Sequence, residues 1–350
     1  MNRIGVLLIN LGTPDAPTPE GVGHYLREFL MDGFVIDLPK PLRWFLVNVM
    51  IVPRRKVKSA RAYQKVQLPG GSPLRVYTRE LAEQLATRLA PDDRWDRYVV
   101  EYAMRYGNPS IAASLAKLHS QNLARIIVLP LYPQYAESSF ETAVVETKRV
   151  AQQLGCADLL SFFPPFYHRP EFINACARRV AEDNEKQSAE YIVFSFHSLP
   201  ERHLKRLDTT REHCLVTSTC CDELSAVNKN CYRAQCMFTA SAIAAQLGLP
   251  EDGYTVSFQS RLGRAKWLGP TTEDVLRDLA GRGVKRIAVS CPSFVADCLE
   301  TVEEMGIRGR QTFIDAGGEE LRLIPSLNAD PFWVEAVAGW IGELSSQEPD

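Results

Sequence analysis

The feature that most constrains this chain is an internal repeat. Residues 98–135 can be laid beside residues 254–294: each stretch reads as a tyrosine, an apolar run, a turn with glycine and proline, an amphipathic run and a second apolar run that ends near proline. Residues 6–14 resemble residues 192–200 in the same way. Two such matches in the same order predict two similar domains that arose by internal duplication.

Each half alternates strand-like and helix-like runs. Continuous apolar, β-branched runs bounded by turn residues are typical of parallel strands covered on both faces. The expected strands are 4–10, 98–102, 125–129, 159–163, 191–196, 255–259, 286–290 and 321–324. The expected helices are 79–89, 110–118, 139–154, 170–183, 272–279 and 331–344, with helix starts expected at Asn108–Pro109 and at Thr271. The alternation predicts an α/β fold of two doubly wound, parallel-sheet domains.

The repeat also suggests where the chain divides. We expect an N-terminal α/β domain at 1–155, a C-terminal α/β domain at 156–325 with a cysteine-rich insertion at 205–236, and a terminal helix and tail at 326–350 that packs back on the N-terminal domain. In doubly wound sheets, ligands bind outside the carboxyl ends of the strands. The residues that follow each strand are therefore the first candidates for a site.

The charge balance excludes one class of partner. The formal net charge of −2 and the pI near 6.3 argue against a surface that binds nucleic acid. No basic segment followed by an apolar core and a cleavage site opens the chain, so we expect a cytoplasmic protein.

The longest apolar run, 44–52, is about half the roughly 20 residues that span a bilayer. Basic residues flank it on both sides. The simpler interpretation is a helix packed on a sheet. The alternative is that 41–56 forms an apolar lip with a basic rim, which makes peripheral contact with the inner face of the membrane.

Titratable residues follow two equivalent strands. His197 comes after the strand at 191–196, and Asp297, Glu300 and Glu304 come after the strand at 286–290. If that segment is helical, the three carboxylates share one face, and their repulsion requires a cation, a proton or an interface. Taken singly, a backbone-bonded histidine and a solvated acidic face are the simpler interpretations. Together, at the strand ends, they predict a cleft with a proton acceptor and an acidic track.

Longer motifs resemble those of the ferrochelatase family from near residue 3 to about residue 342. The family pattern F-S-x-H-S-L-P matches 194–200, and D-x-x-E-T matches 297–301. Further matches are GGSPL at 70–74, RYGNP at 105–109, YPQY at 132–135, FQSRLG at 258–263 and WLGP at 267–270.

This resemblance implies two flavodoxin-like, chelatase-like domains with a porphyrin site between them. It implies the last step of haem biosynthesis, in which Fe(II) enters protoporphyrin IX to give protohaem and two protons. The substrates are then protoporphyrin IX and ferrous iron, and no organic cofactor is needed.

The resemblance also implies roles for particular residues. His197 is the base that takes the pyrrole protons, and Glu300 lies opposite it. Both side chains are acceptable Fe(II) ligands, and which of them delivers the metal stays open. Asp297 and Glu304 extend a proton or metal path. A histidine that is common two residues before the glutamate is here Cys298.

The expected porphyrin contacts are Leu11, Ser72, Arg105, Tyr135, Trp267 and Phe294. Arg105 suits a propionate, because a guanidinium can bind a carboxylate in bidentate fashion. Family members that use coproporphyrin tend to have tyrosine in place of Leu11, which favours protoporphyrin here.

Five of the nine cysteines lie between Cys214 and Cys236, in a polar segment. Without a secretion signal, thiols at this density are more often metal ligands than a disulfide framework. The paired knuckles typical of zinc are missing from the spacing, and four thiolates suit a [2Fe–2S] cluster. Some bacterial ferrochelatases resemble this chain in having an internal cysteine-rich segment.

The expected cluster ligands are Cys214, Cys220, Cys221 and Cys231, because Cys236 falls inside the next helix pattern. A structural zinc or a redox-labile thiol patch is the alternative. The other four cysteines, Cys156, Cys176, Cys291 and Cys298, are expected to be buried thiols.

Two other functions compete with iron insertion into protoporphyrin. A sirohydrochlorin or cobalt-type chelatase would face a more acidic substrate, which the apolar run at 44–52 does not suit. A non-catalytic haem or iron–sulfur sensor on the same fold would have no need of both His197 and Glu300.

Overall fold

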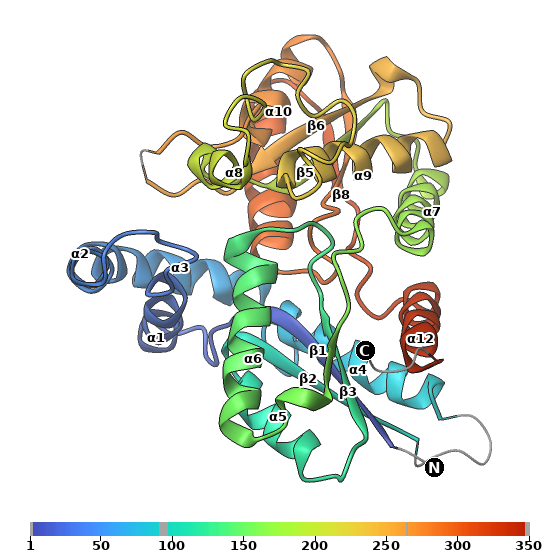
Figure 1. The fold of residues 1–350 in the computed structure, drawn as a ribbon. Helices are drawn as coiled ribbons and strands as arrows, with labels where there is room; N and C mark the ends of the chain where they lie inside the picture. Colours follow the sequence, from blue (N-terminus) through green and yellow to red (C-terminus); the bar gives the residue numbers. More distant parts are fainter. Residues whose placement is uncertain (1–2, 91–96, 264, 347–350) are drawn as a thin grey trace. The chain divides into compact units, whose positions relative to one another are not determined.

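The computed structural model describes residues 3–90, 97–263 and 265–346. They form two compact units (Figure 1). The first comprises Met1–Tyr132, Glu137–Pro165 and Asn328–Asp350, and the second comprises Pro133–Ala136 and Phe166–Leu327. The expected boundary at 155 therefore falls inside the first unit.

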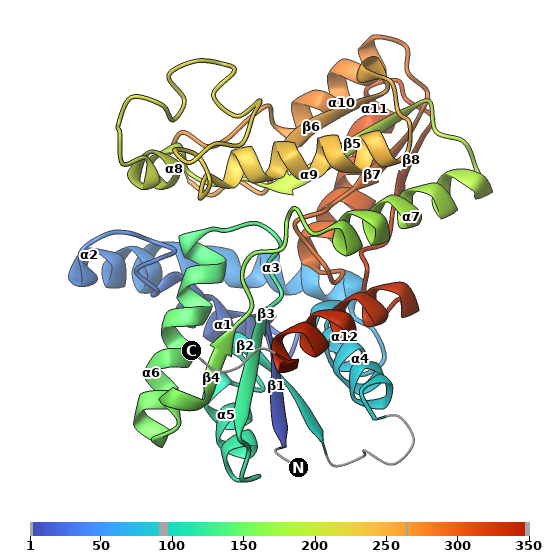
Figure 2. The ribbon, with the colours of Figure 1, turned by 45° about the vertical axis from the view of Figure 1, so that its right-hand side comes forward.

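The first unit is built on a parallel sheet with the strand order β2-β1-β3-β4. Its strands are β1 (Ile4–Thr13), β2 (Tyr98–Gly107), β3 (Arg125–Pro130) and β4 (Leu160–Phe162). Its α-helices are α1 (Pro19–Leu30), α2 (Lys40–Phe45), α3 (Val52–Val66), α4 (Pro73–Arg88), α5 (Ile111–His119), α6 (Thr142–Leu154) and α12 (Pro331–Ser346). Within this unit, α5 and α6 lie on one side of the sheet, and α4 and α12 on the other (Figure 2).

The second unit repeats this topology with the order β6-β5-β7-β8, again parallel throughout. Its strands are β5 (Tyr191–His197), β6 (Tyr254–Gln259), β7 (Arg286–Ser290) and β8 (Glu320–Leu323). Its α-helices are α7 (Pro170–Lys186), α8 (Glu201–Leu207), α9 (Tyr232–Gln246), α10 (Thr272–Gly281) and α11 (Arg310–Asp315). All the expected strands are confirmed among the described residues, as is the α/β fold of two similar domains.

Three segments are π-helical: η1 (Leu46–Ile51), η2 (Glu137–Glu141) and η5 (Leu299–Gly309). The short 3₁₀ turns η3 (Ala157–Leu159) and η4 (Glu251–Gly253) complete the described elements. The segments η2 and η5 follow β3 and β7, which are equivalent strands of the two units. The duplication therefore extends to an uncommon helix type, which elsewhere is frequent at functional sites.

Side chains of the central strands form the core of each unit. In the second unit, Val193 of β5 and Val289 of β7 pack with Leu276 of α10, Met305 of η5 and Phe313 of α11. The helix after β2 begins later than expected: Ser110 caps α5 by accepting a hydrogen bond from Ala113, so the start expected at Asn108–Pro109 is wrong. The cap expected at Thr271 is confirmed by its bond from Asp274 N–H.

The apolar run at 44–52 is not a buried helix. It lies across α2, η1 and the start of α3, which packs on α1 (Figure 1). Trp44 and Phe45 are 56% and 53% exposed. The interpretation of this run as a helix buried on a sheet is therefore wrong, because its largest side chains face outwards.

Gly12 offers a test of the pairing between β1 and β2. Its φ is +114°, and an added Cβ would lie 1.8 Å from the carbonyl oxygen of Tyr106 on β2. We expect Gly12→Ala to lower the free energy of unfolding by about 3 kcal/mol or more, because the two strands must separate locally. Urea denaturation would measure this loss.

The matched control is Gly155→Ala at the C-terminus of α6. Gly155 also has a positive φ, of 73°, but an added Cβ there meets no described atom within 4 Å. This variant should lose only about 1 kcal/mol, the cost of a left-handed conformation for an L-residue. Equal losses in the two variants would show that the contact with Tyr106 is unimportant.

Candidate functional site

His197 stands where the chain order of the second sheet reverses. It is the last residue of β5, which has β6 on one side and β7 on the other. In doubly wound folds this position lies at the ligand-binding edge of the sheet. Within the second unit, the fold thus places the histidine where the strand pattern predicts a site.

A short hydrogen bond sets the tautomer of His197. Its Nδ1 atom lies 2.6 Å from the carbonyl oxygen of Ser198. A carbonyl can only accept, so Nδ1 carries the proton, and in the neutral ring the lone pair belongs to Nε2. The His197 backbone N–H donates to Ser293 Oγ at 3.2 Å, and the ring lies 6.2 Å from the Phe294 ring. The site therefore holds an oriented imidazole with one basic nitrogen.

The acidic residues lie on and beside the π-helix η5. Cys298 caps this helix: its side chain accepts from the Thr301 N–H, and Thr301 Oγ1 accepts from the Cys298 N–H at 3.0 Å. Glu300 and Glu304 are both partly buried within η5. A π-helix thus carries the two glutamates that the sequence singled out.

Asp297 differs from the expectation. It precedes the helix, is 7% exposed, and accepts hydrogen bonds from Thr301 Oγ1 at 3.0 Å and from the Ser326 N–H at 3.2 Å. The expectation that it shares a helical face with Glu300 and Glu304 is therefore wrong. Its carboxylate instead links the start of η5 to the segment after β8.

The surroundings of Glu304 act on its pKa in opposite directions. Burial raises the pKa of this carboxyl, and the charge of Glu300 adds to the effect. Hydrogen bonds from Ser260 lower it, as do the charges of Arg308 and His197. The net pKa of Glu304 is raised, which suits a group that takes up and releases protons.

Three of the residues expected to contact porphyrin lie in the second unit. Phe294 lies beside His197, and the indole of Trp267 donates to the Leu262 carbonyl at 3.1 Å. The Tyr135 backbone N–H donates to Gln235 Oε1 at 2.6 Å. The structure thus brings Phe294 to the histidine, while the other two occupy loops of the same unit.

The other three lie in the first unit. Leu11 is partly buried near the end of β1, and Ser72 is buried at the start of α4. Arg105 already has a partner: its Nη2 lies 2.6 Å from Asp32, and its Nε donates to Thr142 Oγ1 at 2.9 Å. A propionate would therefore have to compete with a partly buried ion pair for this guanidinium.

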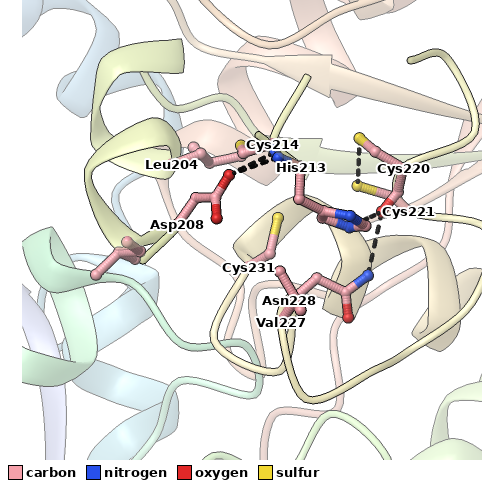
Figure 3. A pocket seen from close by; sticks show the side chains of 10 residues that line it. Leu204, Asp208, His213, Cys214, Cys220, Cys221, Val227, Asn228 and Cys231 are labelled. Atoms are coloured by element: carbon pink, nitrogen blue, oxygen red, sulfur yellow. Dashed lines mark hydrogen bonds between the residues drawn. The ribbon is translucent and has the colours of Figure 1, made fainter. Parts of the chain in front are cut away.

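The four cysteines expected as cluster ligands line one cavity in the second unit. Cys214, Cys220, Cys221 and Cys231 line it together with Asp208, His213, Asn228 and three apolar side chains (Figure 3). Cys220 Sγ and Cys221 Sγ are 3.6 Å apart, and Cys231 lines the same cavity. Cys236 is fully buried in α9 and does not line this cavity.

Two polar side chains hold the cysteine segment in place. Asp208 accepts hydrogen bonds from the backbone N–H groups of His213 and Cys214 at 2.9 and 2.7 Å (Figure 3). Asn228 donates to the carbonyl oxygens of Cys220 and Glu223 at 3.1 and 2.8 Å. These bonds fix an irregular segment that has little apolar content of its own.

The thiols of the cavity differ in acidity. A hydrogen bond from Cys231 lowers the pKa of Cys214, although burial opposes it. Burial raises the pKa of Cys220, and the pKa of Cys221 is raised by its hydrogen bond with Cys231 and by burial. Arg233 bonds to Cys221 and would offset negative charge there. Cys214 is thus the thiol that ionises most readily.

The side chains that the structure describes do not form a preassembled metal-ion site. No group of three or more His, Cys, Asp or Glu side chains that could hold one metal ion occurs among the described residues. The other four cysteines are all buried, as expected.

Sequence reasoning missed the residues that orient this site. Ser198 and Ser293 hold His197, Gln259 and Ser260 hold η5, and Asp208 and Asn228 hold the cysteine segment. Gln259 and Ser260 lie in the FQSRLG motif at 258–263, which was a signal of their importance. Nothing in the motif indicates which atoms they bind.

Solved structures show which class of fold this is. SirB from Bacillus subtilis with Fe³⁺ matches with a TM-score of 0.53 and 13% identity, over 98% of this chain and 96% of that one. Sirohydrochlorin chelatase SirB from Bacillus subtilis subspecies spizizenii, in complex with cobalt, matches with a TM-score of 0.52 and 11% identity, over 99% and 100%. The chain therefore has the fold of a metal chelatase.

Sequence relatives narrow the class. The ferrochelatase family model matches residues 3–344. The ferrochelatase of Azotobacter vinelandii is 48% identical over 97% of this chain and 98% of its own length, and that of Stutzerimonas stutzeri is 45% identical over 100% and 99%. This chain belongs to the ferrochelatase family.

Proposed function

We propose that this enzyme inserts Fe(II) into protoporphyrin IX, giving protohaem and releasing two protons. One observation carries the proposal: a family member has an imidazole with a basic Nε2 at the carboxyl end of a central strand, in the same unit as the partly buried Glu300 and Glu304. Iron insertion exchanges two pyrrole protons for one divalent cation. It therefore needs a base for the protons and a group that presents the cation, and carboxylates suit the second task.

In this proposal, His197, Glu300 and Glu304 have separate roles. His197 accepts the pyrrole protons at Nε2, because the Ser198 carbonyl keeps Nδ1 protonated. Glu300 either presents Fe(II) or receives the proton from His197. Glu304, whose pKa is raised by burial, passes protons onward from there. Imidazole and carboxylate bind Fe(II) without the closed thiolate set that would retain it.

The porphyrin contacts are part of the same proposal. Leu11, Ser72, Tyr135, Trp267 and Phe294 would line the macrocycle. The position of Phe294 beside His197 supports a flat apolar ligand there. Leucine rather than tyrosine at position 11 favours protoporphyrin over coproporphyrin.

The first test removes the base and the central carboxylate. His197→Ala and Glu300→Gln should each lower kcat for haem formation by about a hundredfold or more, since each removes proton transfer or metal delivery. The affinity for protoporphyrin, measured by fluorescence quenching without metal, should stay near that of the wild type. Anaerobic assays with Fe(II), followed in the Soret region, measure the rate.

The matched control for His197 is His168→Ala. His168 is an exposed histidine of the same unit, and its ring lies 4.7 Å from that of Tyr167. This variant should keep its activity. Near-normal turnover by His197→Ala would remove the assignment of the base, and a wild-type enzyme that binds porphyrin but forms no haem would favour a sensor. Preferential metallation of sirohydrochlorin would favour that other class of chelatase.

We further propose a [2Fe–2S] cluster held by Cys214, Cys220, Cys221 and Cys231. Their shared cavity and their separation from Cys236 support this choice. Several thiolates on one short segment repel each other unless a metal neutralises them. When bound, the cluster would supply a cross-link between this segment and the start of α9.

Anaerobically purified protein should therefore be brown and contain iron and sulfide in equal amounts. Serine at any of the four positions should bleach the colour, whereas Cys236→Ser should keep it. In metal-free protein, iodoacetamide should label Cys214 first, because its lowered pKa gives it the largest thiolate fraction. Mass spectrometry of the labelled peptides measures the order.

Two outcomes would contradict the cluster proposal. A colourless protein that holds zinc alone would refute the iron–sulfur centre. Bleaching by Cys236→Ser, with retained colour in Cys214→Ser, would show that a different set of four cysteines binds the metal.

We also propose that residues 41–56 make peripheral contact with the cytoplasmic face of a membrane whose surface is anionic. Leu42, Trp44, Phe45, Val49 and Met50 are all exposed, and the exposed Arg54 and Arg55 lie near the start of α3. Exposed apolar side chains beside arginines suit the boundary between headgroups and acyl chains. No helix in the described part of the chain is long and apolar enough to cross a membrane.

The double change Trp44→Ser with Phe45→Ser should weaken binding to phosphatidylglycerol vesicles by about tenfold or more, because two aromatic anchors are lost. Thermal stability should hardly change, since both side chains are already exposed. Val145→Ser, an exposed apolar position on α6, is the control and should bind like the wild type. Unfolding by the double change, or unaltered vesicle binding, would contradict the proposal.

A further inference from the structure

The end of β6 connects the strand of His197 to η5. Gln259 is the last residue of β6 and lies opposite His197 in the sheet. Its carbonyl oxygen accepts a hydrogen bond of 2.7 Å from the Ser198 N–H. Ser198 is the residue whose own carbonyl orients the imidazole. The backbone at Gln259 is therefore bonded directly to the backbone that sets the base.

The side chain of Gln259 reaches in the other direction, towards η5. It is 3% exposed, and its Nε2 donates to the Glu300 carbonyl oxygen at 2.7 Å. Its Oε1 accepts from Ser195 Oγ at 2.6 Å and from the Cys291 thiol at 3.6 Å. Because the Glu300 carbonyl can only accept, these partners fix which end of the amide faces the helix.

Ser260 holds the second glutamate. Its backbone N–H donates to Glu304 Oε1 at 2.9 Å, and its hydroxyl donates to Oε2 at 2.5 Å. One residue thus binds both oxygens of one carboxylate. Ser260 does so with φ at +65°, a left-handed conformation that a serine rarely adopts. Backbone strain of this kind persists where the surrounding contacts require it, and it gathers at functional sites.

We propose that Gln259 and Ser260 are positioning residues for metal insertion, which hold Glu300 and Glu304 at a fixed place relative to His197. The inference rests on the proposed function and adds residues that act through the glutamates rather than on the substrate. The two act on different parts of the helix: Gln259 holds the backbone of Glu300, and Ser260 holds the side chain of Glu304.

The helix type explains why such support is needed. A π-helix has hydrogen bonds that span five residues. It is rare and occurs mostly as single turns, so a longer one such as η5 is unusual. At the start of η5, the Cys298–Thr301 capping box and Gln259 fix the backbone. Further along, Arg308 pairs with Glu303 at 2.7 Å and with Glu304 at 3.7 Å. Only Ser260 among these groups binds both oxygens of Glu304, so loss of its hydroxyl leaves the backbone N–H as its single bond to that carboxylate, which can then turn towards Arg308.

Two variants separate position from stability. Ser260→Ala and Ser260→Gly both lack the hydroxyl, but glycine adopts the left-handed backbone without strain. Both should lower kcat for haem formation by about ten- to hundredfold, the usual effect of a misplaced catalytic group. The alanine variant should unfold at a lower temperature than the glycine variant, because alanine keeps the backbone strain that serine has and glycine relieves it. The Kd for protoporphyrin without metal should stay within about twofold of the wild type in both.

A third variant tests the other half of the pair. Gln259→Met keeps the length of the side chain and removes the donor to Glu300, so it should show the same separation of kcat from porphyrin affinity. If it does not fold, the two Ser260 variants still decide the question. Thr271→Ala is the matched control, because it removes a hydroxyl bonded to the Asp274 carboxylate at 2.5 Å in the same unit. It should lower stability and leave kcat unchanged.

The outcomes are distinct. Normal kcat in Ser260→Gly would overturn the inference, because that variant lacks the hydroxyl that holds Glu304. A matching loss of kcat in Thr271→Ala would overturn it as well. A wild-type enzyme that forms no haem would instead remove the proposed function.

Discussion

The parallel pairing of β5 with its two neighbours is the constraint on which the site depends. Because β5 lies between β6 and β7, its carboxyl end is surrounded by the first residues that follow both strands. His197, Ser260 and Ser293 come from those three places. Backbone hydrogen bonds of the sheet fix the spacing of these residues, so they are held in place even without contacts between their side chains.

The two units have the same strand order but have diverged in their side chains. In the first unit, the arginine of the repeat, Arg105, pairs with Asp32, and both Tyr106 and Thr142 also bind that carboxylate, at 2.8 and 2.6 Å. Thr142 is the counterpart of Thr301, which bonds to Asp297 in the second unit. A threonine that binds an aspartate near a π-helix is thus common to both units. Of the equivalent strands β1 and β5, only β5 ends in a histidine. The two units therefore share a scaffold, but only the second carries the histidine at the end of its central strand.

The sequence predicted the strands well because each is a continuous apolar run between turn residues, a local property. It also predicted that His197 lies at the end of β5 and that Glu300 follows β7, since strand ends can be read once the strands are known. It was wrong about Asp297, because the fold turns that residue inward to bond with Ser326, far along the chain. The roles of Gln259 and Ser260 depend on which residues the sheet brings beside them, and the left-handed backbone at Ser260 has no local signature. The pairing of Arg105 with Asp32 is likewise a contact across many residues.

The place of α12 has a consequence for how the molecule is made. This last helix belongs to the first unit, where Trp333 and Trp340 are almost fully buried and Trp340 stacks on Phe163 at 4.9 Å. Arg125 on β3 donates to the carbonyl oxygen of Leu344 at 2.7 Å. During synthesis, residues 4–162 therefore cannot pack against α12 until residues 331–346 have also been made. The four strands of the first sheet all precede the main segment of the second unit in sequence, so this sheet can form early, but the core beneath α12 can be completed only once the second unit has been synthesised.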